Sequence, residues 1–205
     1  MPSFETIQGL YQETGFAIFP LVPDRKIPLK GSHGFRDARI VELRDSWPQG
    51  ANVGIATGMR SGGLVVIDCD GEEGHENLRD LLMMNRVEIN TLAVRTPHGY
   101  HYYFRSFIPF ASNASVLMPH VDVRAEGGYV VGPGSVAKGK DYYITRRQWS
   151  VQTLPDALAK MLKITEPNLG EPSEPIPSGD ALEVNLTFGI EMYRDADGKL
   201  RARVK

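Results

Sequence analysis

The chain has 205 residues, 41% hydrophobic and 23% charged, which is the composition of an ordinary globular protein with a substantial core. Lysine and arginine number 23 and aspartate and glutamate 25, so the formal net charge of −2 gives no overall sign of a nucleic-acid partner. The single cysteine, Cys69, excludes an internal disulfide framework and a multi-cysteine zinc site within the chain. Apolar runs are too short to cross a bilayer and no leader-like segment begins the sequence, so we expect a cytoplasmic protein with no membrane partner.

The first part of the sequence alternates helical and extended patterns. Apolar residues at helical spacing predict an amphipathic helix over 4–14, which Gly15 ends. The sequence then predicts a strand over 16–22, a second helix over 39–47, and a short strand with a glycine turn over 52–58. The strongest strand signal is the run Leu-Val-Val-Ile-Asp-Cys-Asp over 64–70, which Gly71 ends.

The second part of the sequence adds short strands and two helices. Helical spacing resumes over 76–84, and residues 91–95 and 100–105 predict a hairpin around a Pro-His-Gly turn. A second strand pair is expected from 121–125 and 129–131 around Gly127-Gly128, followed by a strand over 142–145 and a helix over 154–164. This order predicts an α+β fold whose mixed or antiparallel sheet has helices packed on one face and an open cleft on the other.

The composition changes near the C-terminal end. Proline, glutamate and serine accumulate over 166–180, which is typical of a linker and predicts a domain boundary. We therefore expect one main domain over 1–165, a linker over 166–180, and a C-terminal tail or the start of a further region over 181–205. The tail holds two strand-like runs around a turn at 195–198 and is too short for a core of its own.

Two aspartates end the strongest strand. Side chains alternate along a strand, so Asp68 and Asp70 lie on one face and Cys69 on the other, where we expect a core residue. Two like charges this close repel each other unless a cation neutralises them. Hard oxygen ligands favour Mg²⁺ or Mn²⁺ as that cation. An Asp-x-Asp pair is weak evidence by itself because acidic residues are common at strand ends.

Two further strands offer polar side chains that can join this pair. His101 lies on the polar face of the strand over 100–105, and Asp122 shares a face with Arg124. If these faces converge with Asp68 and Asp70, the carboxylates can hold two metal ions while His101 and Arg124 bind phosphate oxygens. The alternative is structural: His101 caps a hairpin and Arg124 pairs with Asp122.

Three motifs follow one another along the chain: Asp68-Cys-Asp70, Gly99-Tyr-His101 and Val121-Asp122. From about Gly15 to Tyr143 the sequence resembles the N-terminal prim-pol domain of bifunctional DNA primase/polymerases, part of the archaeo-eukaryotic primase superfamily. That superfamily is marked by an Asp-x-Asp/Glu strand, a small-x-His strand and a hydrophobic-Asp strand, in this order. Secondary resemblances are Gly15–Pro20, Lys26–Pro28, Gly34–Ala38, Asn52–Gly58, Arg95–Pro97 and Gly127–Pro133. The chain departs from the family pattern at two places. It has Gly99-Tyr100 where the family usually has Gly-Gly, and Pro133-Gly134-Ser135 where the family has Pro-Pro-Ser.

The resemblance implies a primase-polymerase fold with an RRM-like core. It also implies a template-dependent nucleotidyltransferase that makes or extends primers on single-stranded DNA, in replication of a plasmid, phage or related element. Asp68, Asp70 and Asp122 would be catalytic ligands of Mg²⁺ or Mn²⁺, and His101 would contact the phosphates of the incoming nucleotide. The resemblance adds four further candidates for the nucleotide site, which are Arg124, Thr96, Lys30 and Tyr129. Tyr129 would lie against the sugar and influence whether ribonucleotides are accepted, or else pack as a core aromatic.

The expected partners are a single-stranded DNA template and nucleoside triphosphates. Domains of this kind often precede a helicase, and the 205 residues contain no GxxxxGK[ST] motif, so a replicative helicase would act from a longer form of the chain or from another chain. One rival function is a metal-dependent nuclease or phosphoesterase, which would use the same carboxylates with water as nucleophile. The other is a non-catalytic single-strand-binding replication module that uses basic groups and aromatics such as Tyr100 and Tyr102.

Overall fold

The computed structural model describes residues 4–42, 46–145, 149–162, 190–194 and 200–204. The chain divides into two compact units, Met1–Pro167 and Asn168–Lys205. In the second unit, β14 (Ile190–Arg194) and β15 (Leu200–Val204) form the antiparallel pair that the sequence predicted, while the linker expected over 166–180 lies outside the described residues. Within the described ranges, no helix is long and apolar enough to span a membrane.

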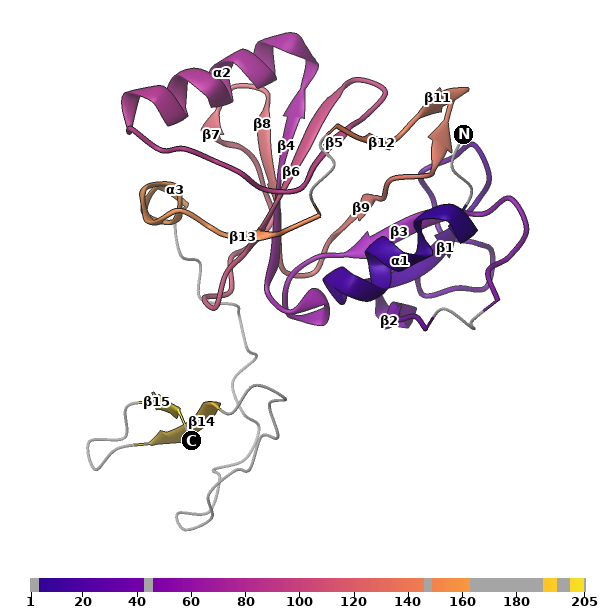
Figure 1. Ribbon diagram of the computed structural model, residues 1–205, viewed down its shortest axis with the longest axis horizontal. Coiled ribbons are helices and arrows are strands. Elements are labelled where there is room, and N and C mark those ends of the chain that lie inside the picture. Colours follow the sequence, from indigo (N-terminus) through magenta and orange to yellow (C-terminus); the bar gives the residue numbers. More distant parts are fainter. Residues whose placement is uncertain (1–3, 43–45, 146–148, 163–189, 195–199, 205) are drawn as a thin grey trace. The chain divides into compact units, whose positions relative to one another are not determined.

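The first unit is a mixed α+β fold, as predicted, but it has two principal sheets where the sequence predicted one (Figure 1). The larger sheet has seven strands in the order β12-β5-β6-β4-β8-β7, and β13 pairs with β6 beyond the end of β5. Only β13 runs parallel to its partner in this sheet. The strands are β4 (Leu64–Asp70), β5 (Ala93–Arg95), β6 (Gly99–Arg105), β7 (Asn113–Met118), β8 (Val121–Arg124), β12 (Tyr143–Ile144) and β13 (Gln152–Thr153).

The smaller sheet has four antiparallel strands in the order β2-β1-β3-β9. A short pair, β10 with β11, follows it in the chain. The strands are β1 (Ala17–Leu21), β2 (Arg39–Ile40), β3 (Asn52–Ala56), β9 (Tyr129–Val131), β10 (Val136–Ala137) and β11 (Lys140–Asp141), with two short helical turns, η1 (Gly34–Asp37) and η2 (Met59–Ser61).

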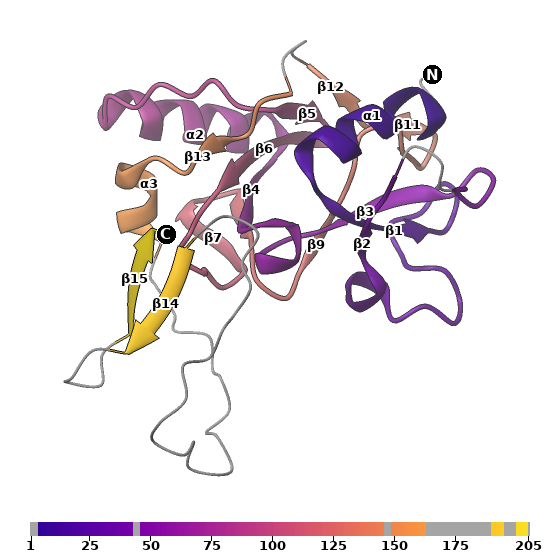
Figure 2. The ribbon, with the colours of Figure 1, turned by 60° about the horizontal axis from the view of Figure 1, so that its bottom comes forward.

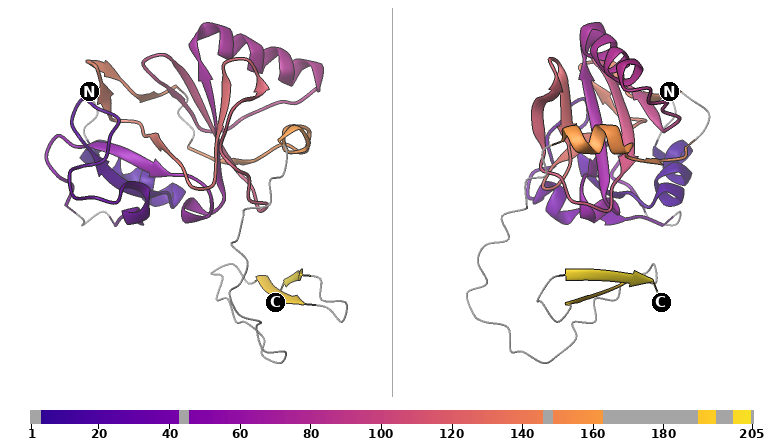
Figure 3. Two further views of the ribbon diagram at one scale, coloured as in Figure 1. Left: turned by 180° about the vertical axis from the view of Figure 1, so that it is seen from behind. Right: turned by 90° about the vertical axis from the view of Figure 1, so that its left-hand side faces the viewer.

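One face of the larger sheet packs under α2 (Gly71–Met84) and α3 (Asp156–Met161), which Figures 2 and 3 show from three further directions. The alternation along β4 sends Val65, Ile67 and Cys69 into this core, where they meet Leu78 and Leu158 from the two helices. Burial, together with the carboxylates of Asp68 and Asp70, raises the pKa of the Cys69 thiol to about 12. Cys69 is therefore a core residue, as its position on the strand predicted.

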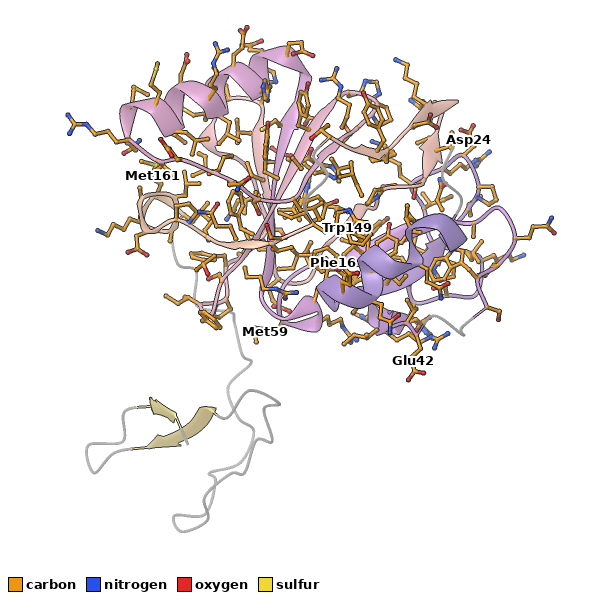
Figure 4. All side chains as sticks on the ribbon, viewed as in Figure 1. Phe16, Asp24, Glu42, Met59, Trp149 and Met161 are labelled. Atoms are coloured by element: carbon orange, nitrogen blue, oxygen red, sulfur yellow. The ribbon has the colours of Figure 1, made fainter. Side chains whose placement is uncertain are left out.

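The opposite face of the larger sheet forms a second core with the smaller sheet and α1 (Phe4–Thr14). Leu64 and Val66 of β4 are completely buried there, and the ring of Phe16 stacks on Tyr103 with centroids 5.8 Å apart. The sequence predicted helices on one face of the sheet only, but α1 also packs into this second core on the other face. Figure 4 labels Phe16 and Trp149, which both belong to this second core.

Arg105 hydrogen-bonds to three backbone carbonyl groups beside the second core. The Arg105 guanidinium at the end of β6 donates hydrogen bonds to the carbonyl oxygens of Ser61 at 2.5 Å and Gly62 at 2.9 Å, and to that of Thr14. Thr14 ends α1, where carbonyl groups lack helical partners and a positive charge is favourable. Arg105 therefore joins the larger sheet to η2 and to the C-terminal end of α1.

The sequence predicted one helix and one strand pairing that the structure does not contain. Residues 39–40 of the expected helix over 39–47 form β2, whose Ile40 lies opposite Ala17 of β1, while residues 43–45 lie outside the described ranges. The segment over 121–125 does not pair with 129–131, because β8 pairs with β4 and β7 whereas β9 pairs with β3. Gly127, at a φ of 74°, lies where the chain leaves one sheet for the other. Strand β7 has no counterpart in the sequence prediction.

Two glycines inside helices give opposite predictions for stability. A Cβ at Gly74 of α2 would lie 2.3 Å from the carbonyl oxygen of His120, whereas a Cβ at Gly9 of α1 meets no atom within 4 Å. Gly9→Ala is expected to raise the free energy of unfolding by about 0.5–1 kcal/mol, because alanine has the higher helix propensity. Gly74→Ala is expected to lower it by about 1–3 kcal/mol, because α2 must move away from the sheet. Urea unfolding measures both changes, and equal stabilisation by the two substitutions would contradict this packing of α2.

Candidate functional site

The register of the larger sheet brings the predicted polar residues together. Strand β4 lies between β6 and β8 (Figure 1), and both His101 of β6 and Asp122 of β8 lie directly opposite Asp68. Directly opposed residues of neighbouring strands share a face, with Cβ atoms roughly 5 Å apart. Asp70 follows on the same face at the exposed end of β4. These four residues form what we call the acidic row: His101, Asp68, Asp122 and Asp70.

Arg124 and His101 contact the carboxylates of this row. The Arg124 Nη2 donates a hydrogen bond of 2.7 Å to the Asp122 carboxylate, and its Nε lies 3.6 Å from the Asp68 carboxylate. The His101 Nε2 is 3.4 Å from Asp68, and its Nδ1 is 3.4 Å from the hydroxyl of Tyr103. Arg124 thus makes the ion pair with Asp122 that the sequence left open as an alternative. His101 contacts Asp68 within the sheet and is not a hairpin cap.

Asp68 is held ionised by its neighbours. Burial alone opposes ionisation of this carboxyl and is the largest single effect on it. The hydrogen bond and charge of His101, with the charges of Arg124 and Lys26, outweigh that effect and keep the Asp68 pKa below its usual range. Asp68 is therefore an anion over the whole physiological pH range.

Asp70 behaves in the opposite way. Burial, followed by repulsion from the carboxylates of Asp68 and Asp122, raises the pKa of Asp70, and the charges of Arg124 and Lys26 offset this only in part. Asp70 also occupies the N-cap position of α2, yet its side chain makes no capping hydrogen bond there. The end of β4 therefore carries more negative charge than the neighbouring cations neutralise.

A pocket of about 210 Å³ opens beside the acidic row. Its walls come from both sheets and from the loop after β1. Two members of the acidic row, Asp68 and His101, share the lining with Arg124, with β9 and with two residues that sequence reasoning missed, Lys26 and Tyr142. The lining consists of Lys26, Asp68, His101, Arg124, Tyr129, Val130, Val131 and Tyr142.

Not every predicted site residue reaches this pocket. Asp68, His101, Arg124 and Tyr129 line it, but Asp70, Asp122, Lys30 and Thr96 do not. The Thr96 hydroxyl accepts hydrogen bonds from the backbone N–H groups of His98 at 3.3 Å and Gly99 at 2.9 Å, so it shapes the turn between β5 and β6. Gly99 lies opposite Asp70, and this turn therefore borders the acidic row without contributing Thr96 to the pocket.

The two missed residues had different signals in the sequence. Lys26 stands in the Lys26-Ile-Pro28 segment, which resembles the family but suggested no role. Tyr142 gave no signal, because an aromatic residue in a short strand is usually a core residue. Burial, with the nearby charges of Asp68 and Asp70, raises the pKa of Tyr142, so its hydroxyl stays protonated and can donate a hydrogen bond.

A larger cavity of about 530 Å³ lies elsewhere, beside Glu13, Arg105 and Trp149. Size alone does not favour it as the functional site. Its one cation, Arg105, already donates to three backbone carbonyl oxygens and serves to hold the fold together. The smaller pocket is lined by Asp68, His101 and Arg124, and the pKa values of Asp68 and Tyr142 are perturbed there, as is common at sites of chemistry.

The donor set of the acidic row suits a hard divalent cation. Three carboxylates supply the oxygen ligands that Mg²⁺ and Mn²⁺ prefer, and a cation there would offset the repulsion that, after burial, raises the pKa of Asp70. In the described part of the chain, however, no three His, Cys, Asp or Glu side chains are grouped closely enough to hold a metal ion. Arg124 contacts two of the carboxylates in this arrangement, so metal binding requires Asp68 and Asp122 to turn away from it.

The fold and the site together define an α+β domain whose central strand ends in a cluster of aspartates beside a polar pocket that Asp68 lines. The chain belongs to the family of the bifunctional DNA primase/polymerase N-terminal domain, whose model matches residues 9–157, more than half of the sequence. This confirms the resemblance that the three motifs carry, and membership indicates DNA primase/polymerase activity. No curated protein matches the chain.

Because the Asp70 carboxylate is repelled by its neighbours, its removal is expected to stabilise the fold but to weaken metal binding. Without divalent cations, Asp70→Asn is expected to raise the free energy of unfolding by less than about 1 kcal/mol, since the exposed charge is partly screened. That corresponds to an increase in Tm of at most about 4 °C. Mn²⁺ is expected to raise the Tm of the wild type and to have little effect on the variant, because bound ligand stabilises only the protein that holds it.

Asp80→Asn is the matched control for this measurement, because Asp80 is an exposed aspartate of α2 outside the pocket. Its Tm and its response to Mn²⁺ should equal those of the wild type. A wild-type Tm response to Mn²⁺ that survives in Asp70→Asn would show that the ion binds elsewhere.

Proposed function

We propose that this chain is a template-dependent nucleotidyltransferase that makes or extends primers on single-stranded DNA, in replication of a plasmid, phage or related element. The observation that carries the proposal is the acidic row: three strands of one sheet bring Asp68, Asp122 and His101 side by side, with Asp70 at the end of the central strand. Family membership supports this interpretation over other uses of clustered carboxylates.

In this proposal Asp68, Asp70 and Asp122 hold two ions of Mg²⁺ or Mn²⁺. Such ions, when bound, lower the pKa of the attacking 3′-hydroxyl and neutralise charge on the triphosphate and the departing pyrophosphate. The carboxylate of Asp68 is available at neutral pH because its pKa is lowered. Arg124, once released from the two carboxylates, offers its guanidinium to phosphate oxygens, for which its planar pair of donors is suited.

His101 contacts phosphate in this proposal, and its surroundings fix the ring for that task. The ring lies between Asp68 and the buried Tyr103, and Tyr142 packs beside it with centroids 6.0 Å apart. Because His101 is itself buried, few other orientations are open to it. A nucleotide would therefore meet a preorganised imidazole, which lowers the entropy cost of binding.

The sugar of the incoming nucleotide is proposed to rest against Tyr129. This ring lines the pocket and packs edge-to-face on Phe19 of β1 with centroids 5.2 Å apart. A rigid aromatic wall at this place would restrict bulk at the 2′ position of the sugar. The proposal also includes a primase-polymerase fold with an RRM-like core, a cleft that continues the pocket along the template, and a replicative helicase acting in the same longer chain or in trans.

Substitution of each aspartate by asparagine tests the catalytic assignment. Asp68→Asn, Asp70→Asn and Asp122→Asn are each expected to reduce template-dependent nucleotide incorporation by at least about 10³-fold, because loss of metal ligation removes several kcal/mol of transition-state stabilisation. Asp80→Asn, outside the pocket, should incorporate nucleotides as the wild type does. Extension of a labelled primer on single-stranded DNA with Mg²⁺ or Mn²⁺, resolved by gel, measures all four.

The same gel separates the proposed activity from its rivals. Products longer than the primer support a polymerase, whereas shortened products would identify a nuclease. Unchanged primer together with metal-independent binding of single strands would identify a binding module without catalysis. A reaction without primer, run with deoxynucleotides alone and then with ribonucleotides added, separates primer synthesis from primer extension.

A further inference from the structure

The loop after β1 carries a lysine to the pocket that no motif assigned to the site. Lys26 is exposed, lines the pocket beside the acidic row, and is near enough for its charge to act on the carboxyls of Asp68 and Asp70. Among the described residues, its ammonium group makes no hydrogen bond or close ion pair. Its hydrogen-bonding capacity is therefore available to a ligand in the pocket.

The backbone that presents Lys26 is held in place on both sides. The Tyr129 hydroxyl donates a 2.9 Å hydrogen bond to the carbonyl oxygen of Lys26 itself. The Asn52 amide donates to the carbonyl oxygen of Arg25 at 2.9 Å, and the Asp24 carboxylate accepts from the N–H of Gly139 at 2.8 Å. Figure 4 labels Asp24 close to β11, which follows Gly139 in the chain. The loop is thus anchored to β3, to β9 and to the β10–β11 turn.

From this geometry we propose that Lys26 binds a phosphate group of the incoming nucleoside triphosphate and that Tyr129 is a positioning residue for Lys26. The inference rests on the proposed function, because the nucleotide supplies the phosphate. An ammonium on a long side chain is a strong donor to phosphate oxygens. A fixed backbone limits the conformational freedom that Lys26 loses on binding, which preserves affinity. Tyr129 then serves two parts of one ligand, with its ring at the pocket wall and its hydroxyl acting through Lys26.

The first test is the KM for a deoxynucleoside triphosphate in primer extension. Lys26→Ala is expected to raise KM about 10- to 100-fold, the range that loss of one charge-assisted hydrogen bond gives. Lys26→Arg should recover most of the affinity, because it restores a cation at the same place. Lys140→Ala, an exposed lysine of β11 that does not line the pocket, is the control and should leave KM unchanged.

The second test isolates the positioning role of Tyr129. Tyr129→Phe keeps the ring but removes the hydrogen bond to the Lys26 carbonyl, and is expected to raise KM about 3- to 10-fold with Lys26 present. In a Lys26→Ala background the same change should have no further effect on KM, because there is no ammonium left to position. Additive effects in the double variant would overturn the positioning role.

Other outcomes distinguish failure of the role of Lys26 from failure of the proposed polymerase function. A wild-type enzyme that extends primers while Lys26→Ala keeps a normal KM overturns the inference and leaves the proposed function standing. An increase in KM for Lys30→Ala and not for Lys26→Ala would show that Lys30 binds the phosphate, and would overturn the inference. If the wild type extends no primer, the proposed function fails. Calorimetric binding of inorganic tripolyphosphate with Mn²⁺ then tests separately whether Lys26 binds phosphate. Binding at least 10-fold weaker in Lys26→Ala would support the inference, whereas equal binding, or none by the wild type, would overturn it.

Discussion

Repulsion among Asp68, Asp70 and Asp122 is the constraint around which this unit is organised. Directly opposed strands place two of the carboxylates side by side, and the third follows at the end of the same central strand. Arg124 pairs with Asp122 and lies near Asp68, but burial and then repulsion from Asp68 and Asp122 still raise the pKa of Asp70. Such an arrangement persists because the packing of the rest of the fold fixes it.

Packing in the two hydrophobic cores fixes the position of β4. Along β4, Val65, Ile67 and Cys69 pack under the helices α2 and α3, while Leu64 and Val66 pack against the smaller sheet. The strand is thus anchored on both faces for most of its length, and only its acidic end meets solvent. Each buried aliphatic side chain stabilises the fold by roughly 1.5–3 kcal/mol, which exceeds the cost of partly screened repulsion at the strand end. Burial therefore fixes the carboxylates in positions they would not adopt in a flexible loop.

Sequence reasoning succeeded where the signal was local and failed where it was not. The period of two along 64–70 assigned Asp68 and Cys69 to opposite faces correctly, and helical spacing identified α1. Gly127-Gly128 suggested a hairpin turn just before β9. The actual partner of β9 is β3, some 75 residues earlier in the chain, and a local pattern does not reveal such a pairing. Lys26 illustrates the same limit, since only the folded loop shows which lysine reaches the pocket. The start of α2 at Gly71, before the predicted start at residue 76, and the strand at Arg39–Ile40 were also missed, whereas the end of α2 at Met84 was predicted.

The catalytic role proposed for the acidic row requires metal ions bound there beside a nucleotide. Anomalous diffraction from crystals grown with Mn²⁺ and a non-hydrolysable deoxynucleoside triphosphate tests it most directly. The account predicts an anomalous peak within coordination distance of the Asp68, Asp70 and Asp122 carboxylates, with the triphosphate reaching from it toward His101 and Lys26. A nucleotide with its Mn²⁺ bound elsewhere on the protein, while Arg124 still pairs with Asp122, would contradict the account.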